Sequence, residues 1–462
     1  SVLQLLLIAP FALPPLVLTI AWSLLASPNA GILNALWSSA FGVTKGPFNV
    51  YSYGGLVWVG VLNFVSVKIL LLLPAFNAMD ATLEESSTMS GASKLSTFSH
   101  VTLPLMLPAI AGVFILSLIR FMESFETELF LGAPAHIYVF TTQIYLLLNT
   151  FPVKYPQAMA LAVSLLVLTF AMAIIQGRLL GGKRYTTVSG KSFRTHPTHL
   201  GMWRWPIFGV CIAFFVVAFL LPLLVLILQS LAPRAGIQSG VLTLANYATI
   251  LQQPKMGAML QNTLLLAVGV GTLGMLLAAV IAYVIVRTEF RGKYVLDMLT
   301  WVPWTVPGIV LSVAMLWAYL TLPGELYGTI WLLIIAVVTT TLPLGVRLMV
   351  GTQVQIAKEL EESSRVHGAT WLETFVYVVL ALVKRGFAVG WIVLCVEAVR
   401  NLGVVLLLYG AASMPISIMI FVLFQEGQTG VVSAIAVVML TVITVLLGLQ
   451  LRLGNESAQA VR

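Results

Sequence analysis

Long apolar windows constrain this chain more than any other feature. A helix needs about 20 apolar residues to cross the hydrocarbon layer of a membrane. Windows of that kind lie near residues 3–26, 54–76, 105–122, 157–180, 207–232, 259–287, 295–320, 327–350, 387–408 and 430–451. Of all residues, 60% are hydrophobic and only 9% are charged, so little water-facing surface can be built. The sequence therefore predicts an all-α polytopic membrane protein with about ten spans.

Two polar stretches interrupt this apolar background with the same internal spacing. Each stretch has a Glu followed by two Ser, then three residues, a Gly, nine residues and an aliphatic segment. The first copy contains Glu85, Ser86, Ser87 and Gly91, and the second contains Glu362, Ser363, Ser364 and Gly368. Every landmark is offset by 277 positions, as in 362 − 85. The repeat predicts two halves, each with one polar element outside the lipid.

Other landmarks align the remaining parts of the halves. Pro10 and Pro14 of the first window match Pro303 and Pro307 in the third window of the second half. We therefore expect a first half at 1–180, a linker at 181–206 and a second half at 207–462, related as parallel repeats. The first half is expected to lack its first two spans because of truncation; a natural ten-span protein is the alternative. Shorter apolar pieces near 137–150 and 412–424 are expected to be partly inserted helices.

Positive charge predicts which side faces the cytosol. With both repeated stretches placed in the cytosol, that side carries 17 of the 24 Lys and Arg residues. Cytosolic loops of membrane proteins are enriched in these residues, which accounts for the net charge of +8. The basic balance therefore indicates a lipid membrane and not a nucleic-acid partner.

The residues of each repeated stretch favour a short helix, a tight turn and a second helix. Thr82 can cap the first helix, whose early Glu residues suit the positive end of the helix dipole. Gly91 and Gly368 permit the sharp turn. A compact helix–turn–helix element of this kind, which we call a knob, can fit into a groove on another protein. The alternative, an ordinary loop with capping residues, explains one copy more readily than two with identical spacing.

The spacing resembles the EAA loop of permease subunits of bacterial ATP-binding-cassette importers. Copy one matches the pattern through Pro104, with Ser86 and Ser87 in place of the usual alanines, whereas copy two has Ala381 where Pro is usual. Two such halves in one chain resemble the fused permeases of iron(III)-type systems, close to those for polyamines, thiamine and phosphonates. The resemblance implies the type I importer permease fold in the bacterial inner membrane.

The same resemblance implies partners and roles. The eight repeated residues would couple to two cytosolic ATPase subunits, and an extracytoplasmic binding protein would deliver the cargo. ATP would be held by the partner subunits, with no cofactor and no enzymatic activity in this chain. The rival class is an ion-gradient-driven secondary transporter, which also uses internal repeats and buried charges.

Charged residues inside apolar windows are the second candidate site. Arg120 lies three residues before Glu123, and Glu397 lies three residues before Arg400, so each pair shares a helix face. One hypothesis is that both pairs line the translocation path; the alternative is that they only fasten the helix bundle. We expect no catalytic or metal site, because no catalytic constellation, phosphate-binding Gly-Lys-Ser/Thr loop or convincing ligand set is present. His196 and His199 lie in the linker with Pro197 between them, and we expect them to be solvated residues and not metal ligands.

Overall fold

The computed structural model describes residues 2–77, 81–181, 201–233, 241–321, 324–354, 359–370 and 373–459. The predicted linker at 181–206, with His196 and His199, lies mostly outside these ranges. The described residues form helices, and they contain no strand beyond a single bridge between Gly328 and Tyr409. This confirms the all-α prediction.

The described helices account for most of the predicted spans. Seven helices are long and apolar enough to cross a membrane, or up to ten if each of three sharply bent helix pairs is one span. The seven are Tyr53–Leu73, Leu95–Glu123, Tyr155–Arg178, Gly201–Ser230, Met256–Arg287, Ile330–Gln353 and Thr429–Gln450. They agree with the apolar windows because length and composition, which the sequence prints directly, decide both.

The chain folds as two compact units that divide after Val225. The first unit contains α1 (Val2–Ile8), η1 (Ala9–Ala12), α2 (Pro15–Ala26), α3 (Ile32–Phe41), α4 (Tyr53–Asn77), α5 (Ala81–Met89), α6 (Lys94–Thr97), η2 (Phe98–Thr102), α7 (Leu103–Glu123), η3 (Glu128–Gly132), η4 (Ala133–Ala135), α8 (Phe140–Asn149), α9 (Tyr155–Gly181), η5 (Gly201–Trp203), α10 (Arg204–Phe215) and η6 (Val216–Leu220). Helix α10 packs on α1, so packing places most of the first span after the linker, as far as Val225, in this unit. The boundary between the packed units therefore differs from the boundary suggested by the repeat.

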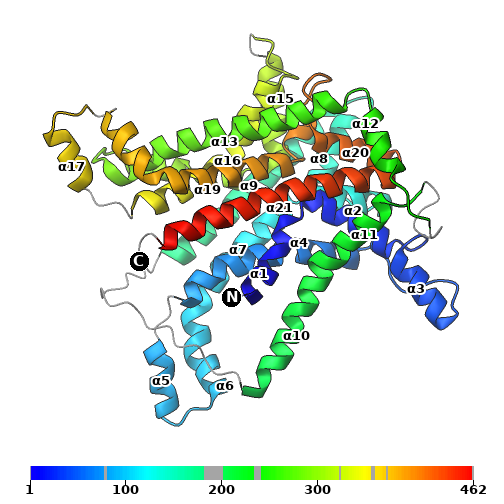
Figure 1. Ribbon diagram of the computed structural model, residues 1–462, viewed down its shortest axis with the longest axis horizontal. Coiled ribbons are helices and arrows are strands. Elements are labelled where there is room, and N and C mark those ends of the chain that lie inside the picture. The colour runs from blue at the N-terminus through cyan, green and yellow to red at the C-terminus, as the bar shows by residue number, and fades with distance from the viewer. Residues whose placement is uncertain are drawn as a thin grey trace. The chain divides into compact units, whose positions relative to one another are not determined.

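The second unit begins within α11 (Leu221–Ser230). It continues with α12 (Ala245–Gln252), α13 (Met256–Arg287), α14 (Lys293–Leu299), η8 (Val302–Thr305), α15 (Gly308–Thr321), α16 (Ile330–Gln353), α17 (Glu359–Val366), η9 (Thr374–Leu380), α19 (Ala381–Arg400), η10 (Val405–Leu407), α20 (Ile416–Gln425) and α21 (Thr429–Gln459). Helix α13 lies along α16 and α19 (Figure 1). A Cβ on Gly271 would come within 2.5 Å of the Cys395 sulfur, so the small residues of α13 permit this close packing.

Two predicted spans are bent at matching repeat positions. The helices before and after Pro14 meet at 99°, and those before and after Pro307 meet at 100°. Proline lacks a backbone N–H and restricts the residue before it, so a helix ends there. The windows at 3–26 and 295–320 are therefore bent pairs and not straight crossings. The matching bends support the alignment of Pro10 and Pro14 with Pro303 and Pro307.

The span after each repeated stretch begins with a π-helical segment. These segments are η2 before α7 and η9 before α19. Because both copies have one, the Pro104 of the first copy is not required for it. Helix α19 ends at Arg400, eight residues before the end of the predicted window at 387–408. The polar residues near Lys384 are helical, whereas residues 401–404 are not.

Candidate functional site

The first repeated stretch folds into the expected helix, turn and helix. We call α5, the turn at Gly91, α6 and η2 the first loop. Gly91 has φ +85°, in the left-handed region that glycine adopts without strain. The N–H groups of Ser90, Gly91 and Ala92 donate to the carbonyl oxygens of Ser86, Thr88 and Ser87 at 3.1, 3.0 and 3.2 Å. These bonds close the end of α5 in the manner of a Schellman cap.

The second repeated stretch has the same backbone. We call α17, the turn at Gly368 and η9 the second loop. Gly368 has φ +89°. The N–H groups of His367, Gly368 and Ala369 donate to the carbonyl oxygens of Ser363, Arg365 and Ser364 at 3.2, 2.9 and 3.2 Å. Each of the six bonded positions in this loop is offset by 277 from its counterpart in the first loop, so the repeated motif specifies a repeated structure.

One side-chain contact also repeats. The hydroxyl oxygens of Ser87 and Thr97 are 2.9 Å apart, and those of Ser364 and Thr374 are 3.2 Å apart. The second Ser of each motif thus joins the first helix to the segment that follows the turn. The sequence pattern predicted both serines as coupling residues and did not predict this internal contact. The signal that could have predicted the contact is the pair of matching threonines, Thr97 and Thr374, which are also 277 positions apart.

The predicted coupling residues are accessible in both loops. Exposed residues are Glu85, Ser86, Gly91, Glu362, Ser363 and Gly368, whereas Ser87 and Ser364 are half-buried. The backbone therefore presents the Glu and the first Ser of each motif outward, while the second Ser is used internally. This arrangement leaves a polar face on each loop that a partner protein can contact.

The Glu before each motif behaves differently in the two loops. In the first loop, the Thr102 hydroxyl donates to Glu84 Oε1 at 2.6 Å. In the second loop, Glu361 is buried and lies 3.1 Å from Arg287 of α13. Sequence reasoning missed both contacts. The adjacent glutamate pairs at 84–85 and 361–362 showed only that acidic residues begin each helix.

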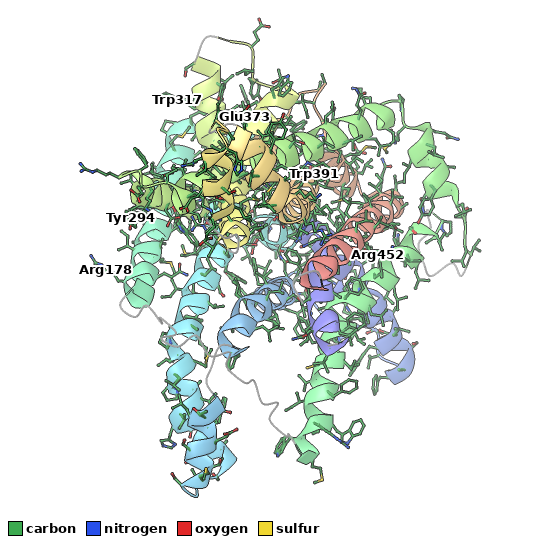
Figure 2. The ribbon with its side chains drawn as sticks, turned by 60° about the vertical axis from the view of Figure 1, so that its left-hand side comes forward. Arg178, Tyr294, Trp317, Glu373, Trp391 and Arg452 are labelled. Atoms are coloured by element: carbon green, nitrogen blue, oxygen red, sulfur yellow. The ribbon has the colours of Figure 1, made fainter. Side chains whose placement is uncertain are left out.

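A capping box begins the second part of the second loop. The N–H and hydroxyl of Thr370 donate to Glu373 Oε2 at 2.7 and 2.8 Å, and the Glu373 N–H donates back to Thr370 Oγ1 at 3.3 Å. Hydrogen bonds from the Thr370 backbone and hydroxyl hold the pKa of Glu373 below its usual range. Glu373 is labelled in Figure 2. In the first loop, Ser93 accepts from the Ser96 N–H at 3.3 Å without a carboxylate.

Both intramembrane charge pairs predicted from their spacing are formed. Arg120 Nη1 lies 2.9 Å from Glu123 Oε2 at the end of α7, and Arg400 Nη1 lies 3.5 Å from Glu397 Oε1 at the end of α19. The order of charges is reversed between the halves, because Arg120 and Glu397 occupy equivalent positions 277 apart. Side-chain exposure is 35% for Arg120 and 32% for Glu397, but 8% for Glu123 and 9% for Arg400. The more exposed member is a cation in the first half and an anion in the second.

A further ion pair was not anticipated. Arg347 of α16 pairs with Asp297 of α14, donates to the Thr300 hydroxyl at 2.7 Å and lies 4.7 Å from the centre of the Trp301 ring. These contacts fix α14 against α16 next to the bend at Pro307. The only sign of this pair in the sequence was that Asp297 lies in the apolar window at 295–320 and Arg347 lies in the window at 327–350.

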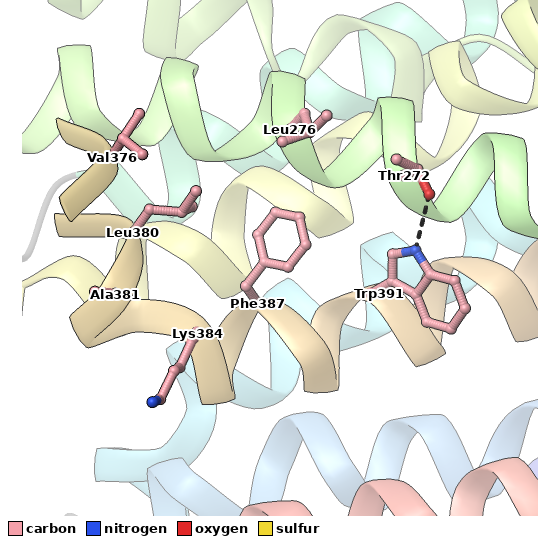
Figure 3. A pocket seen from close by; sticks show the side chains of 8 residues that line it. All are labelled: Thr272, Leu276, Val376, Leu380, Ala381, Lys384, Phe387 and Trp391. Atoms are coloured by element: carbon pink, nitrogen blue, oxygen red, sulfur yellow. Dashed lines mark hydrogen bonds between the residues drawn. The ribbon is translucent and has the colours of Figure 1, made fainter. Parts of the chain in front are cut away.

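A groove lies between α13 and α19 (Figure 3). Its volume is about 440 Å³, and its lining is apolar except for Thr272, Lys384 and the indole N–H of Trp391. That N–H donates to Thr272 Oγ1 at 3.1 Å and closes one end of the groove. The groove thus combines a hydrocarbon-like wall with a single cation.

A known family matches most of the chain. The family is described as the inner membrane component of binding-protein-dependent transport systems, and the match covers residues 1–184 and 270–455. The two matched segments separately include the first and the second loop. The twofold match therefore agrees with the internal repeat.

Curated relatives match over long stretches. The ferric transport system permease protein FbpB of Actinobacillus pleuropneumoniae is 28% identical over 438 residues, covering 94% of this chain and 63% of the relative. A protein of Haemophilus influenzae, also named as a ferric transport system permease, is 30% identical over 410 residues, covering 87% and 64%. The sulfate transport system permease protein CysT of Escherichia coli is 28% identical over 265 residues, covering 54% and 92%. The chain spans less than two thirds of the length of both ferric relatives.

Proposed function

The chain belongs to the family of inner membrane components of binding-protein-dependent transport systems, and on that premise we propose that it is the permease subunit of an ATP-driven importer. In this role it conducts cargo and hydrolyses no ATP itself. Two cytosolic ATP-binding-cassette subunits bind and hydrolyse ATP, and an extracytoplasmic binding protein delivers the cargo. The coupling loops and the linker face the cytosol, as the distribution of Lys and Arg favours.

The observation that carries this proposal is the equivalence of the two loops. Both have a left-handed Gly, three matching backbone hydrogen bonds and a Ser–Thr contact between their two parts. Both leave a Glu and a Ser of the motif exposed. Two rigid, polar knobs of the same shape suit two copies of one ATPase partner. This feature and the family membership disfavour the alternative of an ion-gradient-driven secondary transporter.

We propose iron(III) as the cargo. Support comes from the names of the two ferric relatives, each of which aligns with at least 87% of this chain. The sulfate permease aligns with 54% of the chain, so the shared fold serves more than one cargo. Polyamines, thiamine and phosphonates are the cargoes to compare in uptake assays.

We further propose that the pairs Arg120–Glu123 and Glu397–Arg400 line the conducting path. Both pairs lie at the ends of helices that directly follow the coupling loops, and each has one half-exposed member. A charge in an apolar span is costly unless protein or water compensates it. The half-exposed Arg120 and Glu397 are therefore the members best placed to contact hydrated cargo.

Co-purification tests the coupling role. Tagged full-length protein should retain ATP-binding-cassette ATPase subunits when it is extracted from its native membrane. Glu85→Lys together with Glu362→Lys should lower the recovered ATPase by about tenfold, because it reverses one exposed charge in each docking surface. Glu289→Lys is the matched control, since Glu289 is also exposed but lies outside both loops. Recovery of no ATPase by the unmodified protein would contradict the proposed function.

A further inference from the structure

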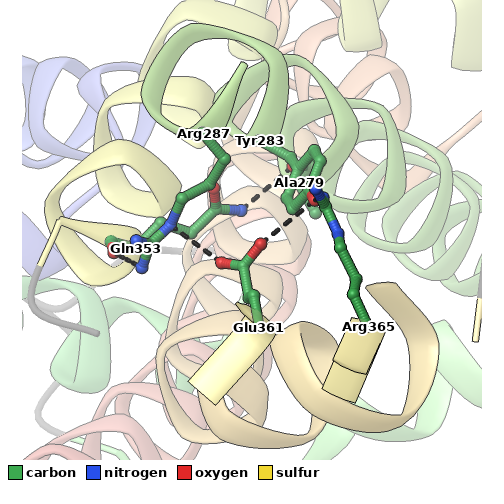
Figure 4. Close-up of polar contacts among 6 residues, drawn as sticks. All are labelled: Ala279, Tyr283, Arg287, Gln353, Glu361 and Arg365. Atoms are coloured by element: carbon green, nitrogen blue, oxygen red, sulfur yellow. Dashed lines mark hydrogen bonds and ion pairs between the residues drawn. The ribbon is translucent and has the colours of Figure 1, made fainter. Parts of the chain in front are cut away.

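A buried carboxylate attaches the second loop to a membrane helix. Glu361 Oε1 lies 3.1 Å from Arg287 Nε, and Glu361 Oε2 accepts a hydrogen bond from the Tyr283 hydroxyl at 3.1 Å (Figure 4). The side chains of Arg287 and Glu361 are only 4% and 8% exposed. Tyr283 and Arg287 are four residues apart on α13, so both present their polar groups to one side chain of α17.

Neighbouring contacts extend this attachment to a second point on α17 and to a second membrane helix. Arg365, one turn after Glu361, donates to the Tyr283 hydroxyl at 3.2 Å. Arg287 Nη2 donates to the carbonyl oxygen of Gln353, the last residue of α16, at 2.8 Å. The Gln353 amide in turn donates to the Ala279 carbonyl oxygen of α13 at 3.1 Å. We call Tyr283, Arg287, Gln353, Glu361 and Arg365 the anchor cluster.

The first loop has a self-contained arrangement at the equivalent position. Glu84 accepts a hydrogen bond from Thr102, which belongs to the same loop. The second loop has Val379 at the position of Thr102, and valine offers no hydroxyl group. No ion pair within the described ranges joins α5 to another helix. The two loops therefore differ in the partner of this glutamate: Glu84 of α5 bonds the segment that follows its own turn, whereas Glu361 of α17 bonds α13.

We propose that the anchor cluster is a positioning device that makes α17 and the cytosolic end of α13 move as one body, so that ATPase movement at the second loop is passed directly to α13. This inference rests on the proposed function. A buried ion pair resists separation, because parting its members leaves each charge uncompensated in a low dielectric. Helix α13 packs along α16 and α19, so a displacement of its end reaches both helices. The anchor cluster thus connects the second loop, where the ATPase is proposed to dock, with the membrane helices α13, α16 and α19.

Hydrogen exchange tests the first part of this inference, using full-length protein in lipid nanodiscs without ATPase. Arg287→Met combined with Glu361→Gln removes both charges, which avoids leaving one buried and unpaired. Amides of residues 359–366 should then exchange about tenfold faster, whereas those of α5 should not change. Arg291→Met is the matched control, because Arg291 is exposed and lies outside the cluster. Unchanged exchange in α17 would overturn the proposal.

The second part needs the assembled transporter. In the unmodified complex, a non-hydrolysable ATP analogue should change amide protection both in α17 and near residue 283. In the double variant, the change near residue 283 should fall at least severalfold while the ATPase stays bound. Thr102→Val in the first loop should leave that response intact. If amide protection near residue 283 changes as much in the double variant as in the unmodified complex, the cluster only stabilises the fold and the proposal is wrong. Failure of the unmodified protein to bind ATPase would instead contradict the proposed function.

Discussion

The two loops share a backbone but differ in what holds their first helix. In both, a Gly in the left-handed region ends the helix, and a Ser–Thr contact joins the two parts. In the first loop, Glu84 bonds Thr102 of the same loop. In the second loop, Glu361 forms an ion pair with Arg287 and accepts a hydrogen bond from Tyr283, both on α13. The shared features suit a common partner surface, whereas the different glutamate contacts give each loop its own connection to the membrane helices.

This difference shows that a repeat can preserve a docking shape while changing how the shape is supported. The turn and the exposed Glu are local features, so the motif fixes them in both halves. By contrast, what holds the first helix depends on the side chain that its glutamate contacts. That side chain can lie nearby or far away in the sequence, and a single substitution can remove or create its hydroxyl or guanidinium group. Thr102 and its counterpart Val379 illustrate such an exchange. Substitutions can therefore show where the two loops behave alike and where they do not.

The largest expected effect is equal in the two loops. Gly91→Pro and Gly368→Pro each force a residue with φ near −65° into a position at φ +85° or +89°. Each also removes an N–H that donates to Thr88 or Arg365. We expect either variant to abolish uptake of the proposed cargo, iron(III), while the amount of protein in the membrane stays unchanged. Uptake by membrane vesicles and quantification of the inserted chain are the measurements.

Two other glycine substitutions provide controls for this prediction. Gly177→Ala and Gly448→Ala change helical glycines that have open space around them and an ordinary φ, so uptake should persist. Full uptake by one proline variant and none by the other would break the equivalence of the loops. It would show that a single loop suffices for coupling.

Local pattern allowed part of this structure to be predicted from the sequence. The turns at Gly91 and Gly368 and the pairs Arg120–Glu123 and Glu397–Arg400 involve residues that are close along the chain. By contrast, the contact between Tyr283 and Glu361 joins residues 78 positions apart, and no periodicity reveals such a contact. The bend at Pro307 was not predicted, because hydropathy reports the composition of a window and not the direction in which the helix axis runs.

The charge pairs extend the comparison to the helices that follow the loops. In the first half, removing the more exposed member by Arg120→Met leaves Glu123 buried and uncompensated. In the second half, Glu397→Gln removes the carboxylate that pairs with the buried Arg400. We expect each of these variants to lose about 3–5 kcal/mol of stability, the usual cost of breaking a buried pair.

Removing the buried member should cost less. Glu123→Gln and Arg400→Met leave a half-exposed charge that water can solvate, at a cost of about 1 kcal/mol or less. Unfolding of the purified protein in detergent measures all four variants. The double variant Glu397→Gln with Arg400→Met should recover stability, and its uptake then tests the path role. Equal destabilisation by the exposed and the buried member would contradict the reversed arrangement of the two halves.

The smallest expected effect distinguishes the loops by pH. The pKa of Glu373 is held below its usual 4.5 by the bonds from Thr370, so the ionised carboxylate stabilises the capping box. This stabilisation is complete above pH 4.5 and is lost as the pH falls through the lower pKa of the folded state. The first loop has Ser96 at the equivalent position and no titrating group there. Amide protection in residues 374–380, corrected for the intrinsic exchange rate, should therefore fall by about twofold on acidification, with little change at residues 97 and 98. Residues 99–102 are left out of the comparison because His100 and Glu84 form hydrogen bonds there. Glu373→Gln should abolish the pH dependence, and Ser96→Glu should introduce it into the first loop. A pH response of equal size in both loops of the unmodified protein would show that Glu373 is not its source.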